Sequence, residues 1–153
     1  MRIGQGFDAH KIKEGEEVVL GGVHIPSNFS IVAHSDGDVI THAVIDAILG
    51  AFSLGDLGTH FPSEDESYKD VSSRSLLREV LEKIGDQKIS NLDITYIGEE
   101  PKISTYVDQI KKNLSEDLNI NVDQVSCKAT TTDRLGYQGR KEGVSALAII
   151  LFD

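Results

Sequence analysis

The chain of 153 residues contains a single cysteine, Cys127, so no disulfide can form within it. Cys127 lies between Val125 and Ala129 in a strand-like run, and we expect it to be a small buried side chain. Long hydrophobic runs are missing as well, and none approaches the roughly 20 apolar residues that cross a bilayer. Candidate site residues follow Met1 closely, so we expect no signal or transit peptide. These features favour a cytoplasmic protein with no membrane partner.

Basic residues are few, because 15 lysines and arginines stand against 25 aspartates and glutamates, a formal net charge of −10. Such a surface repels nucleic acid and anionic membranes, which weighs against both as partners. It would also repel a phosphorylated substrate, unless bound metal ions and a few local cations reverse the field at the site. The negative net charge is therefore only a weak argument against a phosphate-bearing ligand.

Hydrophobic periodicity predicts one α+β domain that spans residues 1–153, without repeats or long linkers. A hairpin is predicted over 17–25, because two short apolar runs flank Gly21 and Gly22, and glycine readily adopts the positive φ of tight turns. Four further runs have the pattern of strands: 1–8, 89–97, 125–131 and 144–152. Three runs have the pattern of helices: 38–52, 73–84 and 107–118. We expect a mixed four-stranded sheet with the helices packed on one face, the hairpin beside it, and loops over 27–37 and 54–70.

Asp8, His10 and His42 are candidate ligands of a metal ion. Asp8 and His10 are two apart in a short run with the pattern of extended backbone, in which alternate side chains point to the same side. His42 lies in the first predicted helix and supplies a third donor. Two histidines and one carboxylate suit Zn²⁺, and three protein ligands rather than four are typical of a catalytic site. Gly4 and Gly6 precede the pair and let other groups approach the strand closely.

A polar stripe on the first helix supports this interpretation. Asp38, His42 and Asp46 are four apart and therefore lie on one side of the helix. We predict that Asp46 orients a ligand imidazole from behind. A stripe of this kind is more often a solvated helix edge, and a lone histidine is more often a surface residue than a ligand. The combination with Asp8 and His10 favours a lined site.

The segment from Lys128 to Gly136 is a candidate phosphate site. Thr130, Thr131 and Thr132 end a predicted strand and offer hydroxyl and backbone N–H groups, and Asp133 has the oxygen ligands that Mg²⁺ prefers. Threonine is also an ordinary strand residue, and the residues that follow suit an ordinary turn. Beside a metal site the segment favours a phosphate clamp.

Eight blocks of the chain resemble, in order, the family of 2-C-methyl-D-erythritol 2,4-cyclodiphosphate synthases over essentially its whole length. The blocks are Arg2-Ile-Gly-Gln-Gly-Phe-Asp-Ala-His10, Gly21-Gly-Val-His-Ile-Pro26, Ala33-His-Ser-Asp-Gly-Asp38, His42-Ala43, Leu54-Gly-Asp-Leu-Gly58, Phe61-Pro62, Pro101-Lys102 and Lys128-Ala-Thr-Thr-Thr132. Eight blocks in the right order are highly specific.

The resemblance implies a CMP-releasing phosphorus–oxygen lyase of the non-mevalonate isoprenoid pathway. The substrate would be 4-diphosphocytidyl-2-C-methyl-D-erythritol 2-phosphate, whose 2-phosphate attacks the β-phosphorus of its own diphosphate and closes a cyclic diphosphate. It implies one Zn²⁺ per subunit on Asp8, His10 and His42, and Mg²⁺ or Mn²⁺ on Asp133. The family usually has glutamate at that last position, so the side chain here is one methylene shorter. The resemblance also implies a homotrimer in the bacterial cytoplasm, with each site shared between neighbouring chains.

Further roles come from the same resemblance. It implies catalytic roles for His34 and for Thr131, which would stabilise the transition state. It implies substrate binding by Asp8, His10, His34, Ser35, Asp56, Leu57, Gly58, Phe61, Pro62, Ser63, Glu64, Asp65, Gly98, Glu99, Glu100, Pro101, Lys102, Ile103, Ser104, Thr130, Thr131, Thr132, Asp133, Tyr137 and Arg140. We expect the Glu99 and Glu100 carboxylates to point to solvent, because acids inside a nucleotide pocket would disfavour a cytidine diphosphate.

Two other functions remain open from the residues themselves. A zinc-dependent hydrolase of a phosphorylated small molecule would need a general base beside the free metal position, for which Asp46 or His34 is available. A nucleotide-binding module with a structural metal would need a fourth protein ligand.

Overall fold

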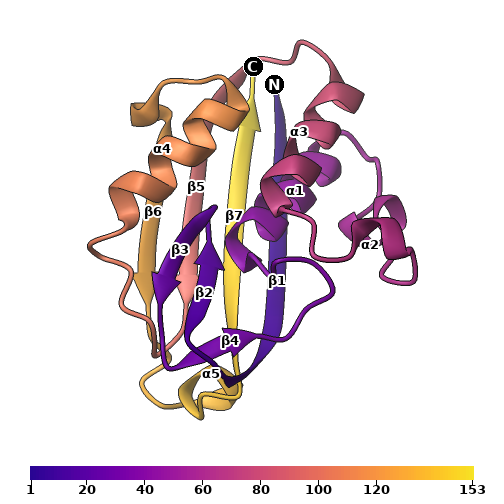
Figure 1. Cartoon of the computed structure of the whole chain (residues 1–153). Helices are drawn as coiled ribbons and strands as arrows, with labels where there is room; N and C mark the ends of the chain where they lie inside the picture. The colour runs from indigo at the N-terminus through magenta and orange to yellow at the C-terminus, as the bar shows by residue number, and fades with distance from the viewer.

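The computed structural model describes the whole chain, residues 1–153, and contains a five-stranded sheet in the order β4-β1-β7-β5-β6 (Figure 1). Along the chain these strands are β1 (Arg2–Glu14), β4 (Phe29–Ile31), β5 (Ile89–Ile97), β6 (Val125–Thr130) and β7 (Gly143–Phe152). β5 and β6 run parallel, and the other neighbours are antiparallel. The α+β class and the mixed sheet are confirmed, but the predicted number of four strands is wrong.

The additional strand, β4, lies at the edge of the sheet in a segment predicted as loop. It pairs only with the last part of β1, where Ile12 lies opposite Ile31 and Glu14 lies opposite Phe29. β1 itself continues well past its predicted end at residue 8. Its second half carries the exposed side chains of Lys11, Lys13 and Glu14, so the sequence there lacks the apolar alternation that predicts a strand. β4 has three residues, which is too short for any periodicity to show.

The predicted hairpin is present as β2 (Glu17–Leu20) and β3 (Val23–Pro26). Gly21 and Gly22 form its turn with φ of 56° and 70°, the left-handed region that glycine enters without steric cost. Their two N–H groups donate to the buried Asp38 carboxylate at 2.8 and 2.7 Å. Asp38 also caps the following helix by accepting from Thr41 N at 3.1 Å. One carboxylate thus joins the hairpin turn to the helix that carries His42.

The helices are α1 (Val39–Ala51), α2 (Leu57–His60), α3 (Ser73–Ile84), α4 (Val107–Leu118) and α5 (Gly136–Gly139), with 3₁₀ turns η1 (Glu66–Tyr68) and η2 (Val122–Gln124). Of these, α1, α3 and α4 cover one face of the sheet together with the hairpin, and α5 lies at one end of the sheet (Figure 1). α1, α3 and α4 confirm the three predicted helices. α2 and η1 lie in the predicted loop over 54–70, because a single turn is too short to show a helical period. No helix has the length and apolar character that a membrane crossing would require.

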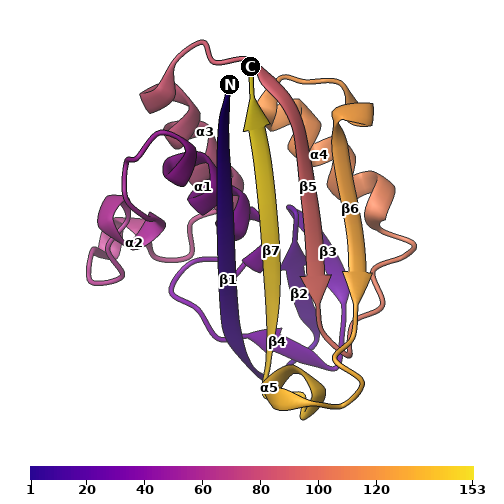
Figure 2. The ribbon, with the colours of Figure 1, turned by 180° about the vertical axis from the view of Figure 1, so that it is seen from behind.

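α1 packs unusually closely on β1, and two glycines make this approach geometrically feasible. A Cβ atom on Gly4 would lie 1.8 Å from the carbonyl oxygen of Ala47, and one on Gly6 would lie 2.0 Å from that of Ala43. The hairpin and α3 also contact α1, so eleven of its thirteen residues are buried. The helix is therefore not amphipathic with a solvated edge, and His42, only 6% exposed, lies between helix and sheet. The opposite face of the sheet is free of helices (Figure 2).

Candidate active site

Asp8, His10 and His42 meet as predicted from the sequence. The three separations are 2.9 Å from Asp8 Oδ2 to His10 Nε2, 3.0 Å from Asp8 Oδ2 to His42 Nδ1, and 3.0 Å between the two nitrogens. The donor atoms form a nearly equilateral triangle, and the residues are the one cluster in the chain able to offer three such atoms to a metal ion.

The fold brings these residues together through the period of β1. Gly4, Gly6, Asp8 and His10 alternate along the strand and so share the face that α1 covers. Gly4 and Gly6 leave room for the helix backbone, and the larger side chains of Asp8 and His10 lie beside the start of the helix. His42 lies in the first turn of α1 and reaches both of them from the helix side.

The donor set fits zinc. Two imidazole nitrogens and one carboxylate oxygen suit a borderline-soft cation, whereas Mg²⁺ and Ca²⁺ prefer oxygen ligands throughout. Zinc bonds of about 2.0–2.1 Å in a tetrahedral arrangement separate ligands by about 3.3 Å, so the triangle needs to open by only a few tenths of an ångström. The cluster holds three protein donors, which leaves a coordination position for another molecule.

The electrostatics of the triad favour an ionised carboxylate. Burial raises the pKa of Asp8, but hydrogen bonds from His10 and His42 and their charges outweigh it and hold that pKa well below its usual range. Burial lowers the pKa of His42, yet the hydrogen bond and charge of Asp8 raise it above its ordinary value overall. A bound cation would take the place of the proton that this arrangement attracts.

A cleft of about 180 Å³ opens beside the triad. The residues around it from the predicted substrate segments are His34, Ser35, Leu57, Phe61 and Ser63. His34 lies 3.4 Å from the carbonyl oxygen of Asp65, which ties the two predicted segments together. Asp56 caps α2 by accepting from Thr59 N at 2.8 Å, next to Gly58. Pro62 and Glu64 lie exposed on the loop that follows α2.

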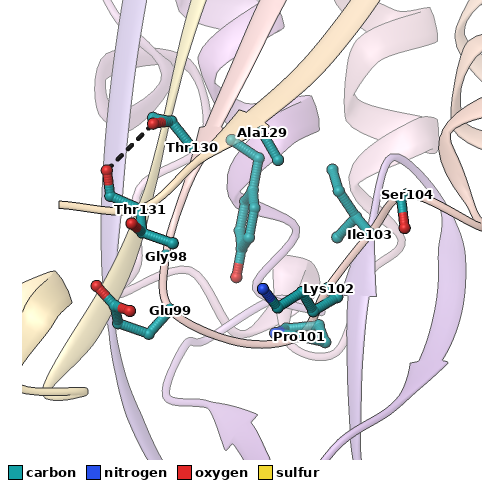
Figure 3. Close-up of a pocket in the computed structure, with 10 residues that line it drawn as sticks. Gly98, Glu99, Pro101, Lys102, Ile103, Ser104, Ala129, Thr130 and Thr131 are labelled. Atoms are coloured by element: carbon teal, nitrogen blue, oxygen red, sulfur yellow. Dashed lines mark hydrogen bonds between the residues drawn. The ribbon is translucent and has the colours of Figure 1, made fainter. Parts of the chain in front are cut away.

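A second pocket, of about 230 Å³, lies between the loop after β5 and the end of β6 (Figure 3). Its lining includes most of the residues expected to hold cytidine and phosphates: Gly98, Glu99, Pro101, Lys102, Ile103, Ser104, Thr130 and Thr131. Tyr96 and Ala129 complete it, and the sequence interpretation missed both because they lie inside regular strands. The Thr130 hydroxyl donates to the carbonyl oxygen of Thr131 at 3.1 Å.

The two glutamates before Pro101 behave differently. Glu100 forms an ion pair with Lys141 at 3.0 Å and does not line this pocket. Glu99 does line it, and its carboxylate accepts from Arg134 N at 3.2 Å. The contact with Arg134 N is exposed, and Figure 3 shows the Glu99 carboxylate turned away from Lys102, so the expectation that it points to solvent stays a prediction.

The two pockets lie at the same end of the sheet, on either side of β7. His10 pairs with Val144, and Ile97, just before the second pocket, pairs with Ser145. Two strand spacings of about 4.8 Å separate β1 from β5. The pockets share no lining residue, so one chain does not join them into a single cavity.

Similarity to known proteins agrees with this geometry. The sequence model of the YgbB family matches residues 1–153. This chain belongs to the YgbB family. Two curated relatives are named 2-C-methyl-D-erythritol 2,4-cyclodiphosphate synthase. The relative from Saccharophagus degradans is 48% identical over 153 residues and 99% of both chains, and that from Azotobacter vinelandii is 46% identical over 99% of this chain and 98% of its own.

Solved structures show the same fold. The CDP complex of IspF from Plasmodium falciparum has a TM-score of 0.85 and 42% identity over 99% of this chain and 94% of its own. A CDP-bound 2C-methyl-D-erythritol-2,4-cyclodiphosphate synthase has a TM-score of 0.91 and 32% identity over 99% of this chain and all of its own. The resemblance drawn from the eight sequence blocks is thereby confirmed.

Asp133, the expected second cation ligand in this YgbB-family chain, lies in a left-handed turn. Its φ is 54°, that of Arg134 is 64°, and its N–H group donates to the Thr131 hydroxyl at 3.3 Å. Aspartate tolerates this conformation better than most residues. Thr132 and Asp133 belong to this loop and Tyr137 to α5, which follows it, while Arg140 is paired with Glu142 at 3.0 Å.

The hydrogen bond predicted from Asp46 to a ligand imidazole is not present. Its carboxylate accepts from Leu57 N at 2.7 Å and so anchors α2. His42 Nε2 instead lies 2.8 Å from the Ser73 hydroxyl and 3.3 Å from that of Ser35. Ser73 had no signal in the sequence, since it opens a helix 31 residues away and meets His42 only through the packing of α3 on α1.

Proposed function

We propose that this chain is a 2-C-methyl-D-erythritol 2,4-cyclodiphosphate synthase, a CMP-releasing phosphorus–oxygen lyase of the non-mevalonate isoprenoid pathway. It would convert 4-diphosphocytidyl-2-C-methyl-D-erythritol 2-phosphate into 2-C-methyl-D-erythritol 2,4-cyclodiphosphate and CMP. Membership of the YgbB family over residues 1–153, with relatives of that name at 46–48% identity, supports it. The single observation that most supports a metal-dependent reaction is the triangle of donor atoms from Asp8, His10 and His42 beside the open cleft.

Asp8, His10 and His42 would hold one Zn²⁺ per subunit, and Asp133 would hold Mg²⁺ or Mn²⁺ together with the substrate. Bound zinc would supply a Lewis acid for an oxygen of the β-phosphate, and the second cation would neutralise diphosphate charge. Without such cations, a chain of net charge −10 would repel a substrate that carries three phosphates. The residues around them have to orient the substrate, because the nucleophile belongs to the substrate itself.

The remaining residues divide by the part of the substrate that each would hold. His34 and Ser35 would contact phosphates at the rim of the metal cleft and hold the substrate in a bent conformation. Asp56 to Gly58, with the loop from Phe61 to Asp65, would bind the methylerythritol hydroxyls. Gly98 to Ser104 would bind cytidine, and Thr130 to Thr132 would bind its phosphates, with Thr131 stabilising the transition state. Tyr137 and Arg140 would add further contacts.

A homotrimer with shared sites accounts for two features of the single chain. The face of the sheet without helices carries Ile3, Phe7 and Ile149, which are 69, 52 and 39% exposed. Apolar side chains gathered on one uncovered sheet face favour burial against further protein. The metal cleft and the nucleotide pocket are also separate in one chain, and a neighbouring chain would supply the missing half of each site. A single domain over residues 1–153 and a cytoplasmic location complete the proposal.

The two other functions find less support. A hydrolase needs a free general base beside the metal, and Asp46 already accepts a hydrogen bond from Leu57 N, which leaves His34. A structural metal needs a fourth protein donor, and the cluster has three.

Incubation of the zinc-loaded protein and Mg²⁺ with the diphosphocytidyl substrate tests the proposal. Phosphorus NMR should show the cyclic diphosphate and CMP appearing in equal amounts as the substrate disappears. Linear phosphates in place of the cyclic product, or no turnover, would contradict it.

A further inference from the structure

Ser73, the first residue of α3, contacts the back of a metal-ligand histidine. Its hydroxyl lies 2.8 Å from His42 Nε2, and Ser73 is completely buried. The other ring nitrogen, Nδ1, is the one that faces Asp8 and His10. The two nitrogens of His42 are thus divided: Nδ1 faces the candidate metal position, and Nε2 faces the Ser73 hydroxyl and, at the longer distance of 3.3 Å, that of Ser35.

Asp36 determines which way the Ser73 hydroxyl donates. Asp36 accepts a short hydrogen bond from the hydroxyl of Ser73, and it also accepts from Ser73 N at 2.9 Å. A third donor, Asp38 N, lies 3.1 Å from the same carboxylate. A serine hydroxyl has one hydrogen, and here Asp36 takes it. The oxygen of Ser73 can therefore only accept from His42, which places a hydrogen on Nε2.

We propose that Ser73, held by Asp36, is a positioning residue that keeps the lone pair of His42 Nδ1 directed at the metal. An imidazole with its hydrogen fixed on Nε2 presents an unprotonated Nδ1, and the same hydrogen bond fixes the plane of the ring. This inference rests on the proposed zinc at Asp8, His10 and His42. It adds a residue from α3 to a site that otherwise comes from β1 and α1.

The asymmetry between Ser73 and its neighbour supplies a matched control. Ser72 is the N-cap residue of α3, but its side chain makes no capping hydrogen bond. Asp36 accepts from Ser73 N and so serves the end of the helix in its place. Ser72→Ala and Ser73→Ala remove the same atom from adjacent positions, and only the second removes the contact with His42.

The test is the zinc affinity of the full-length protein, measured by competition with a chromogenic chelator. Ser73→Ala should bind zinc about 10- to 100-fold more weakly than the unmodified chain, the usual effect of losing a partner behind a metal ligand. Ser72→Ala should bind it unchanged. Equal affinity of the Ser73→Ala and unmodified proteins would overturn the inference and leave the proposed function intact. Failure of the unmodified protein to bind zinc would overturn the metal assignment and the inference together.

A second measurement does not depend on the folding of a variant. Long-range ¹H–¹⁵N NMR of the zinc-loaded protein should show His42 protonated at Nε2, with a hydrogen that exchanges slowly with solvent. A purely structural serine would not determine the position of this hydrogen. Protonation of His42 at Nδ1, with Nε2 unprotonated, would overturn the inference.

Discussion

Replacing Gly6 by alanine should damage both the stability of the fold and the metal site. The added Cβ would lie 2.0 Å from the carbonyl oxygen of Ala43 and 2.6 Å from Ala47 N, and both are backbone atoms of α1. Neither can rotate away as a flexible side chain would. Relief requires α1 to move from β1 by more than 1 Å, because an ordinary contact of this kind lies beyond about 3 Å, as close packing demands. His42 moves with the helix, and the triangle with Asp8 and His10 widens.

The expected loss is about 3 kcal/mol of unfolding free energy, at the upper end of the range for overpacked cores. For a domain of this size that corresponds to a fall in Tm of about 6–12 °C. Differential scanning calorimetry measures it on the metal-free protein, and zinc affinity should fall in parallel. Gly50→Ala is the matched control, because its Cβ would have its nearest neighbour at 3.6 Å and alanine favours a helix. A Gly6→Ala protein with unchanged Tm would refute the close packing of α1 on β1.

Three further outcomes follow from single residues. His42→Ala should abolish CMP release yet leave the fold intact by circular dichroism, because His42 supplies a metal donor; turnover near the normal rate would remove it from the site. Asp133→Glu should retain activity with a changed preference between Mg²⁺ and Mn²⁺, and an unchanged cation dependence would show that this carboxylate holds no metal. Burial raises the pKa of the Cys127 thiol to about 11, so at pH 8 iodoacetamide should alkylate it about 100-fold more slowly than in the urea-unfolded chain. Equal alkylation rates in the folded and unfolded chains would show that the Cys127 thiol is not protected by burial.

The metal triad was predictable because each member follows a local period. Asp8 and His10 are two apart on a strand, and the glycines at positions 4 and 6 continue the same face toward the helix. His42 required one tertiary assumption, that the helix after residue 38 packs on the first strand. The structure shows that packing, because a Cβ atom added at position 4 or 6 would lie only 1.8 or 2.0 Å from a carbonyl oxygen of α1.

The hydrogen-bond partner of His42 Nε2 was not predictable in the same way. Spacing of four residues places Asp46 beside His42 on the helix, but it does not say which neighbouring element each side chain meets. α2 takes the Asp46 carboxylate through Leu57 N, and α3 brings Ser73 to His42 instead. Both contacts depend on helices that pack against α1. Strand β4 was missed for a related reason, because its three residues and the charged end of β1 gain their order only by pairing.

The source of the oxygen atoms in the products tests the central claim most directly. In the proposed reaction the 2-phosphate of the substrate attacks its own β-phosphorus, so no water oxygen enters any product. Turnover in ¹⁸O-enriched water, followed by phosphorus NMR, should give cyclic diphosphate and CMP that carry no ¹⁸O. A linear phosphate product carrying one solvent ¹⁸O would contradict the account, because the triad of Asp8, His10 and His42 would then support the attack of water.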